Sequence, residues 1–88
     1  MKYYVYLIAS IKKSKIKTYV GYTNNLKKRL IQHNLGRGAK STRGRKWKFI
    51  YFKKYSTKKS AMSREYYLKK NKKKRKLLMF KFLTKNQI

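Results

Sequence analysis

Hydrophobic positions along the chain mark out three strands. Residues 3–9, with the sequence YYVYLIA, are aromatic or aliphatic throughout, which is typical of a central strand covered on both faces. Residues 17–22 and 47–53 also have strand composition, and Gly21 interrupts the former where another group can approach the backbone closely. The polar residues 10–16 predict a hairpin loop between the first two strands.

Two other segments repeat their hydrophobic residues at helical spacing. In residues 24–35 leucine and isoleucine recur in this way, with Thr23 as the expected N-cap and Gly36 as the expected stop. Thr57 is the expected N-cap of a second helix over residues 58–70.

Two cation-rich segments complete the chain. Residues 36–46 hold three of the four glycines and predict a basic loop. Residues 69–76 carry seven cations in eight positions, and the apolar residues 77–83 after them predict a short terminal helix packed on the core. We expect one domain, with residues 1–76 as its body and residues 77–88 as a C-terminal helix packing on it.

The predicted order is therefore β-β-α-β-α-α. The chain has 88 residues, enough for one small core, which its nine tyrosines and four phenylalanines can fill. A strand-loop-strand opening is most simply an antiparallel hairpin. We expect an α/β protein of the α+β type, with a small antiparallel three-stranded sheet flanked by helices.

The charge of the chain points to a polyanionic partner. It has 28 lysines and arginines but one acidic residue, for a net charge of +27. Self-repulsion at that level destabilises a compact state unless a polyanion neutralises it, nucleic acid being the first candidate and an anionic membrane the second. Codon drift toward A+T would also enrich lysine, but it accounts less well for the loss of nearly all carboxylates. We expect nucleic-acid binding.

Several kinds of site are excluded by composition. Without cysteine there are no disulfides and no thiolate metal sites, and one histidine with one acid cannot build a zinc or calcium cage. No apolar run approaches the roughly 18 residues of a membrane-spanning helix, and no segment has one wholly apolar and one wholly cationic face. We expect a cytoplasmic protein without a membrane partner.

The single acid, Glu65, lies in the second predicted helix. Helical projection places it on the same face as Ala61, Met62 and Leu68, so we expect it to point toward the protein or a cleft at its edge. The alternative is an internal ion pair with one of the many cations.

A second polar cluster involves the first predicted helix. Arg29 and His33 are four residues apart and should project together from one helix edge toward the sheet. Tyr6 and Tyr19, on the adjoining strands, would complete the cluster. Taken singly, His33 is also consistent with a partly buried helix histidine and Arg29 with a surface cation.

The order and spacing of four segments resemble a known family. YVYLI at residues 4–8 is followed by TYVGYT at 18–23, LKKRLIQHN at 26–34 and REYYLKK at 64–70. Together they resemble the GIY-YIG nuclease domain over residues 3–76, most of all the small stand-alone bacterial members of its single-domain subfamily. The resemblance implies a divalent-metal-dependent DNA endonuclease that hydrolyses phosphodiester bonds, with a place in DNA repair or recombination.

The resemblance also implies catalytic residues, which are Tyr6, Tyr19, Arg29, His33 and Glu65. Glu65 would hold Mg²⁺ or Mn²⁺, with waters and substrate oxygens as the other ligands. Arg29 would clamp a non-bridging phosphate oxygen. Nearby cations are expected to lower the pKa of a tyrosine so that it can act as the base, and either tyrosine could do so. His33 would hold or relay the phenol proton.

Further residues are expected to contact nucleic acid. Lys40, Arg43, Arg45 and Lys69 would track the phosphate backbone, and Gly21 would let substrate or the first helix approach the second strand. If about five phosphates are neutralised on a duplex, the logarithm of the binding constant should fall with that of the salt concentration at a slope near −4.5.

The chain also departs from the family pattern. Tyr4 stands where the family name has its first glycine, Asn25 where an acid is common, and Lys46 where a proline usually opens the third strand. The alternative is a non-catalytic basic protein on the same scaffold that binds DNA or RNA, or is associated with the ribosome. DNA is the expected partner of a nucleoid-associated monomer or weak dimer.

Overall fold

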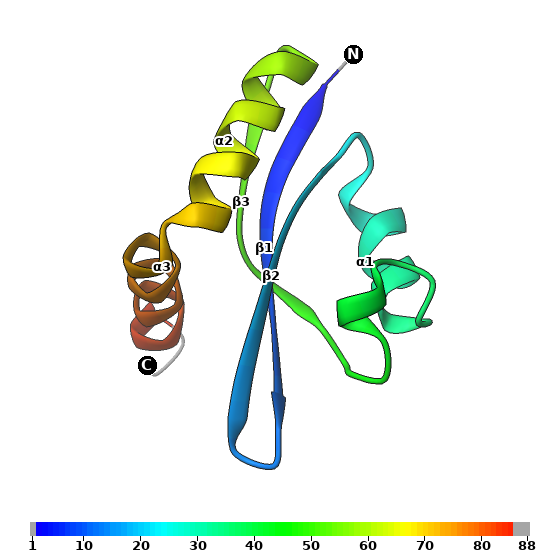
Figure 1. Ribbon diagram of the computed structural model, residues 1–88, viewed down its shortest axis with the longest axis vertical. Coiled ribbons are helices and arrows are strands. Elements are labelled where there is room, and N and C mark those ends of the chain that lie inside the picture. Colours follow the sequence, from blue (N-terminus) through cyan, green and yellow to red (C-terminus); the bar gives the residue numbers. More distant parts are fainter. Residues whose placement is uncertain (1, 86–88) are drawn as a thin grey trace.

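The computed structural model describes residues 2–85, in which helices cover both faces of one sheet (Figure 1). The three strands are antiparallel in the order β2-β1-β3, so β1 is central and β2 is an edge strand. This confirms the predicted class and element order. The elements are β1 (Tyr3–Lys12), β2 (Lys15–Thr23), α1 (Leu26–Asn34), the 3-10 turn η1 (Lys40–Thr42), β3 (Lys48–Tyr55), α2 (Lys58–Lys70) and α3 (Lys72–Lys85).

The β1–β2 hairpin is longer than the sequence indicated. The prediction of a loop over residues 10–16 was wrong, because both strands continue until only Lys13 and Ser14 remain between them. Both residues have positive φ, as a two-residue turn that matches strand twist requires. Ile11 and Ile16 pair directly across the exposed end, and this apolar pair supports the extension.

The first helix begins later than expected. Thr23 is still the last residue of β2, and the N-cap is Asn25, whose side chain accepts a hydrogen bond from the Lys28 backbone nitrogen at 3.0 Å. The Thr23 N-cap prediction was therefore wrong. Gly36 follows the Leu35 C-cap with a φ of 76°, which confirms it as the helix stop.

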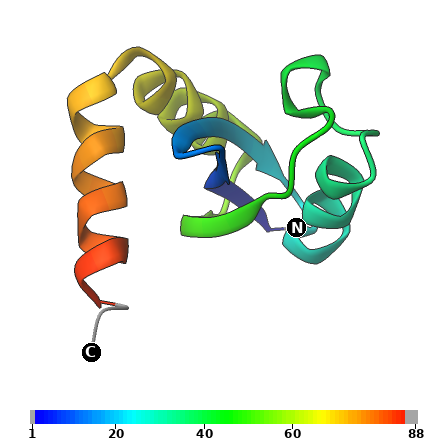
Figure 2. The same ribbon diagram turned by 90° about the horizontal axis from the view of Figure 1, so that it is seen from below.

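The last two helices meet at a sharp corner (Figure 2). Thr57 caps α2 as predicted, accepting a hydrogen bond from the Ser60 nitrogen. Asn71 ends α2, and its side chain accepts from the Lys74 nitrogen at the start of α3. Because this cap is available, α3 already begins at Lys72, and the prediction of a helix starting at residue 77 was wrong. Residues 86–88 of the expected terminal segment lie outside the described residues.

The two faces of the sheet carry separate cores. The face under α2 and α3 is aliphatic, and its buried members include Val5, Leu7, Ala61 and Leu68. The opposite face, under α1, is built on Tyr6, Ile8 and Trp47. A register shift against β3 after Leu7 places Ile50 and Tyr51 on the same, aliphatic face. The aromatic face positions the chemical groups.

Candidate active site

Tyr6 lies at the centre of the candidate site, on the middle strand. Its side chain is 1 % exposed, and its cross-strand neighbour on β2 is Gly21. A Cβ atom at Gly21 would clash with the Tyr6 hydroxyl and would lie 2.6 Å from its Cζ atom. Glycine is therefore required here, because it lets the phenol ring lie across the β2 backbone.

Two residues of α1 contact the Tyr6 hydroxyl. Arg29 donates a hydrogen bond to it from Nε at 3.3 Å, and His33 Nε2 lies 2.8 Å from it. The Arg29 guanidinium also donates to Gln32 Oε1 at 3.2 Å, which fixes its orientation. The two residues lie one helical turn apart and face the sheet together, as the sequence predicted.

The hydrogen bonds of Thr42 determine the tautomer of His33. The Thr42 hydroxyl lies 2.9 Å from the Ala39 carbonyl oxygen, which can only accept, so the hydroxyl proton is donated there. His33 Nδ1, 2.9 Å from the same hydroxyl, must then be the donor of that second bond. In the neutral imidazole this leaves Nε2 as an acceptor, and Tyr6 donates its phenol proton to it.

The pKa values of the cluster agree with this neutral assignment. Burial, and then the nearby Arg29 guanidinium, lower the pKa of His33 to about 4. Burial raises the pKa of the Tyr6 phenol, and the hydrogen bond and charge of Arg29 offset only part of that effect. The expectation that neighbouring cations lower the pKa of the tyrosine was therefore wrong for Tyr6, because desolvation outweighs them.

The loop that carries Thr42 is fixed to β3 and to the end of α1. Trp47 donates from its indole nitrogen to the Thr42 carbonyl at 2.8 Å, and its backbone is bonded on both sides by the Asn34 side chain. A Cβ atom at Gly38 would clash with the His33 ring. Sequence reasoning did not assign Thr42 or Gly38 a role. Their only signal was the small-residue pattern of the basic loop.

Tyr19 lies beside the cluster on the adjoining strand. Its ring centroid is 5.1 Å from that of His33 and 6.4 Å from that of Tyr6. It is half-buried and also lines a small surface pocket of about 200 Å³ with Lys69 and Arg75. Tyr19 thus contacts the Tyr6–His33 cluster and shares a pocket with Lys69 of α2.

Glu65 lies on α2, which covers the face of the sheet opposite to α1. Its side chain is 19 % exposed and pairs with Lys69, one turn later, at 3.5 Å. Its negative charge is the weakest of the influences that raise the pKa of Tyr6. Ala61 and Leu68 on its face are buried as predicted, whereas Met62 is exposed, and its prediction as a core-facing residue was wrong.

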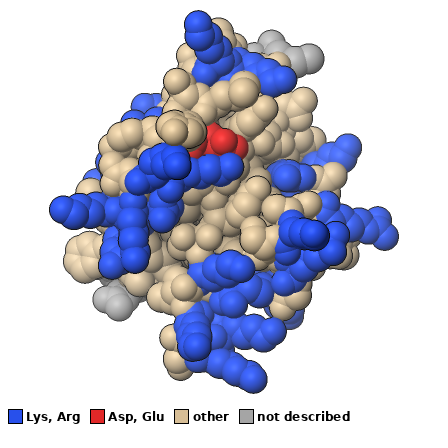
Figure 3. All heavy atoms as spheres, viewed as in Figure 1, with Lys and Arg blue, Asp and Glu red and all other residues tan. Residues whose placement is uncertain are grey.

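The surface around Glu65 is cationic. In the space-filling view the acidic side chain is a single red patch bordered by lysine and arginine side chains (Figure 3). The ion pair expected as the alternative for Glu65 is present, but it is partly exposed, and such pairs contribute about 1 kcal/mol or less. The carboxylate therefore remains available to a stronger cation.

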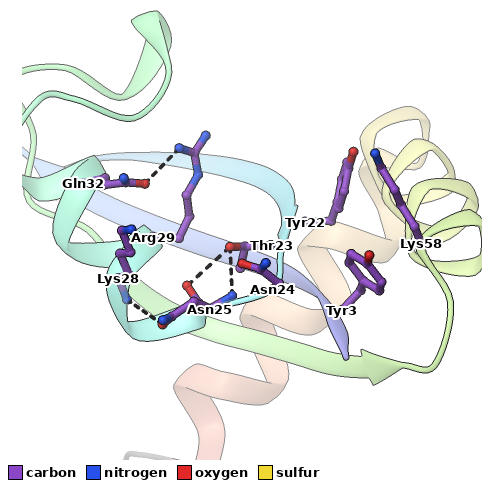
Figure 4. A pocket seen from close by; sticks show the side chains of 9 residues that line it. All are labelled: Tyr3, Tyr22, Thr23, Asn24, Asn25, Lys28, Arg29, Gln32 and Lys58. Carbon is purple, nitrogen blue, oxygen red and sulfur yellow. Dashed lines mark hydrogen bonds between the residues drawn. The ribbon is translucent and has the colours of Figure 1, made fainter. Parts of the chain in front are cut away.

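A polar pocket of about 500 Å³ opens next to Arg29 (Figure 4). Its walls come from the β2–α1 turn, from α1 and from the start of α2, and Lys28, Arg29 and Lys58 supply three cations. In Figure 4, Tyr22 and Lys58 stand on one side of the pocket and Arg29 on the other. A polar pocket lined by three cations suits a phosphate group. The pocket is completed by Tyr3, Tyr22, Thr23, Asn24, Asn25 and Gln32.

The predicted phosphate contacts of the basic loop differ in their surroundings. Lys40 and Arg43 are exposed. Arg45 is half-buried and donates to the carbonyls of Ser10 and Lys15, at 3.1 and 3.3 Å, which ties the loop to the β1–β2 hairpin. Its Nε atom is buried without a partner in the described residues. These internal bonds give Arg45 a structural function.

The donor set of the site fits a divalent ion of one particular kind. Among residues 2–85, no three histidine, cysteine, aspartate or glutamate side chains lie together. A single, partly exposed carboxylate suits a hard ion such as Mg²⁺, which commonly takes one or two carboxylates and completes its shell with waters and substrate phosphates. The residues present therefore fit an ion that is bound jointly with the substrate.

Comparison with known proteins identifies the family of this chain. Residues 2–78 match the family model of the GIY-YIG catalytic domain. The chain belongs to the GIY-YIG family. That family is a nuclease superfamily whose members generally use divalent metals, and membership implies a nucleic-acid substrate. The resemblance identified from the sequence is thereby confirmed.

The relatives of this GIY-YIG domain are small bacterial proteins. A UPF0213 protein of Clostridium perfringens is 50 % identical over 68 residues, which cover 76 % of this chain and 70 % of the relative. One of Oceanobacillus iheyensis is 42 % identical over 82 residues, 92 % of each chain. UPF0213 proteins form a single-domain bacterial GIY-YIG subfamily.

A solved structure resembles this GIY-YIG domain throughout. The solution NMR structure of a UPF0213 protein from Bacillus halodurans is 33 % identical, with a TM-score of 0.51, and the match covers 92 % of this chain and 84 % of that one. Within residues 2–85, no helix is both long and apolar enough to span a bilayer.

Proposed function

We propose that this chain is a divalent-metal-dependent endonuclease that hydrolyses phosphodiester bonds in DNA during repair or recombination. The observation that carries the proposal is the Tyr6 hydroxyl. It is bound at once by a guanidinium and by a neutral imidazole, and the charge of Glu65, the one acidic side chain in the sequence, also acts on its pKa. A core hydroxyl needs one partner, whereas three oriented polar groups beside an open pocket are typical of catalysis.

Arg29 is the residue that we assign to the scissile phosphate. Its guanidinium is held by Tyr6 and Gln32 and lines the polar pocket. A non-bridging oxygen placed there receives charge-assisted hydrogen bonds that strengthen as charge develops in the transition state. Lys28 and Lys58, on either side of the pocket, would hold a neighbouring phosphate.

Tyr6 and His33 together are assigned to proton transfer. The phenol already donates its proton to His33 Nε2, so it can take a proton from the attacking water while it passes its own to the imidazole. The resting pKa of His33, about 4, opposes this step. Burial is the larger cause of this low pKa, and a phosphate bound at Arg29 would offset the smaller part that comes from the guanidinium charge, which would make His33 a somewhat better base. Tyr19 remains the alternative base.

Glu65 is the residue that would hold Mg²⁺ or Mn²⁺. When bound, the ion would neutralise charge on the phosphate and the leaving oxygen. Lys69 must leave the carboxylate for this to happen, and the negative substrate gives its ammonium group another partner. Exposed Lys40 and Arg43 would contact the backbone farther along the strand.

One observation favours a second function, a nucleic-acid-binding protein that does not cut. The net charge of +27 is enough for tight binding to DNA or RNA without chemistry, including binding to ribosomal RNA. The two functions differ in what Glu65 contributes, because a carboxylate weakens binding to a polyanion but is required for metal-dependent cleavage.

The experiment is a cleavage and binding assay of Glu65→Gln. Wild type with Mg²⁺ or Mn²⁺ should nick labelled DNA from a panel of duplex, flapped and branched forms, and an RNA arm tests the alternative partner. The variant should lose cleavage and keep or improve its affinity. Met62→Gln, an exposed change on the same helix, is the matched control and should cut normally. Binding of these substrates by wild type and Glu65→Gln alike, with no cleavage by either, would establish the non-cutting function, and equal cleavage by both would refute the role of Glu65.

A further inference from the structure

An apolar groove lies between the hairpin end of β2 and α3. It has a volume of about 390 Å³ and is lined by Ile16 and Thr18 of β2 and by Met79, Phe80 and Leu83 of α3. Phe80 is 63 % exposed and Ile16 52 % exposed, so large apolar surfaces face solvent here. The aliphatic core of the domain includes Met79 but not Ile16 or Phe80, and the exposure of these two side chains requires another explanation.

The rim of the groove is cationic. Lys72, Arg75 and Lys76 line it beside the apolar residues. An exposed aromatic ring next to cations suits a ligand with a flat apolar face and adjacent negative charge. An unpaired nucleotide has both, since its base can stack on the ring while its phosphate meets the cations. A duplex hides its base faces and cannot use such a groove.

The groove adjoins the small pocket next to Tyr19. Thr18 and Arg75 line both the groove and the small pocket that also contains Tyr19 and Lys69. Lys69 is the partner of Glu65, and the Tyr19 ring contacts the cluster around Tyr6. A strand that passes Tyr19 and Lys69 would therefore meet the groove next.

The helix that forms one wall is firmly placed. Arg75 donates to the Leu68 and Lys69 carbonyl oxygens, at 2.7 and 2.6 Å, and so closes the carboxyl end of α2. Leu78 and Met79 are buried against the sheet on the same helix. The groove is a preformed surface, which lowers the entropic cost of binding.

We propose that the β2–α3 groove binds an unpaired nucleotide of the substrate strand, with its base against Phe80 and its phosphates at Lys72 and Lys76. The inference rests on the proposed nuclease function in one respect, which is that the bound strand is the one to be cut. It assigns a substrate class to the site, DNA with a single-stranded segment next to the cut. The competing occupant, an acidic amphipathic segment of another protein, is an outcome of the test.

The direct test uses Phe80→Trp, which places an indole in the groove. The other tryptophan, Trp47, is 4 % exposed and cannot stack on a ligand. In metal-free buffer, oligo(dT) should quench the new fluorescence, and a duplex at equal phosphate concentration should quench it far less. Equal quenching by both, or none, would overturn the proposal. Quenching by an acidic amphipathic peptide that oligo(dT) fails to displace would also overturn it, in favour of a protein partner.

Substitution of Phe80 by alanine measures how much the ring contributes to binding. Phe80→Ala should weaken oligo(dT) binding about tenfold, the usual loss for one base–aromatic stack, and leave duplex affinity unchanged. Leu77→Ala, which removes an apolar side chain that is 44 % exposed on the same helix but outside the groove, should change neither. Replacing Lys76 by Gln should reduce the salt slope for the single strand by about 0.7.

Failure of this inference is distinguishable from failure of the nuclease proposal. The binding measurements need no metal and no cleavage. They therefore show whether the groove binds an unpaired nucleotide even if the protein cuts nothing. If it does cut, Phe80→Ala should slow cleavage of a flapped substrate about tenfold at subsaturating concentrations and spare a plain duplex. An equal loss on both substrates would assign Phe80 to folding or general binding and would refute the groove.

Discussion

The two sides of the candidate site are built in opposite ways. On the α1 side, Tyr6 and His33 are buried, and the Tyr6 hydroxyl and both ring nitrogens of His33 have defined partners. On the α2 side, Glu65 is partly exposed and has a weak ion pair with a lysine that is itself half exposed. The first side is fixed before the substrate arrives, whereas the second can change partners.

This difference teaches which part of the chemistry has to be positioned in advance. Proton transfer and phosphate clamping need atoms held within hydrogen-bond distance, and a buried network supplies that rigidity. Recruiting an ion together with the substrate needs an accessible carboxylate that exchanges cations easily. Substitutions on the buried side should therefore lower stability or cleavage rate strongly, and substitutions on the exposed side should have small effects.

The largest expected effect is the pH dependence of stability set by the buried side. At pH values well above 6.5 His33 is neutral in both the folded and the unfolded state. Between pH 6.5 and 4 the unfolded chain takes up a proton that the folded one, with its pKa of about 4, does not. The free energy of unfolding should fall by about 3 kcal/mol over this range and level off below it. Urea unfolding at several pH values measures this.

The control for that measurement is His33→Gln, whose stability should hardly change over the same range whatever its absolute value. Because the chain has one acidic side chain, carboxylate titration adds little to the slope. A wild-type stability that is flat from pH 6.5 to 4 would show that His33 is not held neutral by burial.

A substitution at Gly21 should be the next most damaging change. The methyl group of Gly21→Ala would push the Tyr6 ring away from Arg29 and His33, and a displacement of about 1 Å costs roughly 100-fold in rate. Single-turnover cleavage measures the loss. In the Tyr6→Phe background the same change should cost little more, since the displaced hydroxyl is already gone. Fully additive losses would mean that Gly21 acts on something other than Tyr6.

Thr42 gives a sharper test of the buried side, because only its hydroxyl should matter. Thr42→Val removes the acceptor for His33 Nδ1, so the ring proton can move to Nε2 and oppose the Tyr6 proton. We expect about a tenfold loss of rate, a changed pH–rate profile and an altered ¹⁵N tautomer signature, with Thr42→Ser restoring all three. A rate loss without a tautomer change would make Thr42 a packing residue.

The smallest expected effect is on the exposed side. Lys69→Gln removes the ammonium group that competes for Glu65, and an exposed pair of this kind is worth about 1 kcal/mol or less. The Mg²⁺ concentration for half-maximal cleavage should fall by up to about fivefold, at unchanged maximal rate. Lys70→Gln, one residue farther along the helix, is the control. A lower maximal rate would instead assign Lys69 to the transition state.

The fold was largely predictable because its signals are local. Strand composition and cap residues such as Thr57 and Gly36 act over a few positions, and they gave the correct element order. The errors also have local causes. Lys13 and Ser14 adopt a turn usually made by asparagine and glycine, so the polar hairpin was mistaken for a loop. Asn71 caps α3, and the start of this helix was missed because its first turn consists almost entirely of lysine and arginine.

The positions of the candidate site residues were predictable where helix spacing or the family resemblance indicated them. Arg29 and His33 follow from their four-residue separation, and Glu65 from its place among Ala61 and Leu68. The role of Thr42 depends on a loop folding back onto α1, and no short-range pattern encodes that. The pKa direction of Tyr6 depends on burial competing with charge, and only the three-dimensional arrangement shows which of the two is larger.

The position of β2 at the edge of the sheet has a consequence for self-association. An edge strand offers its unpaired backbone groups to a second copy of the same strand, which is a common route to aggregation. Here that strand carries Lys15 and Lys17, and two copies would bring like charges together. At low ionic strength, charge repulsion therefore opposes pairing of β2 with a second copy of the same strand. The same edge should pair more readily in concentrated salt, where that protection is screened.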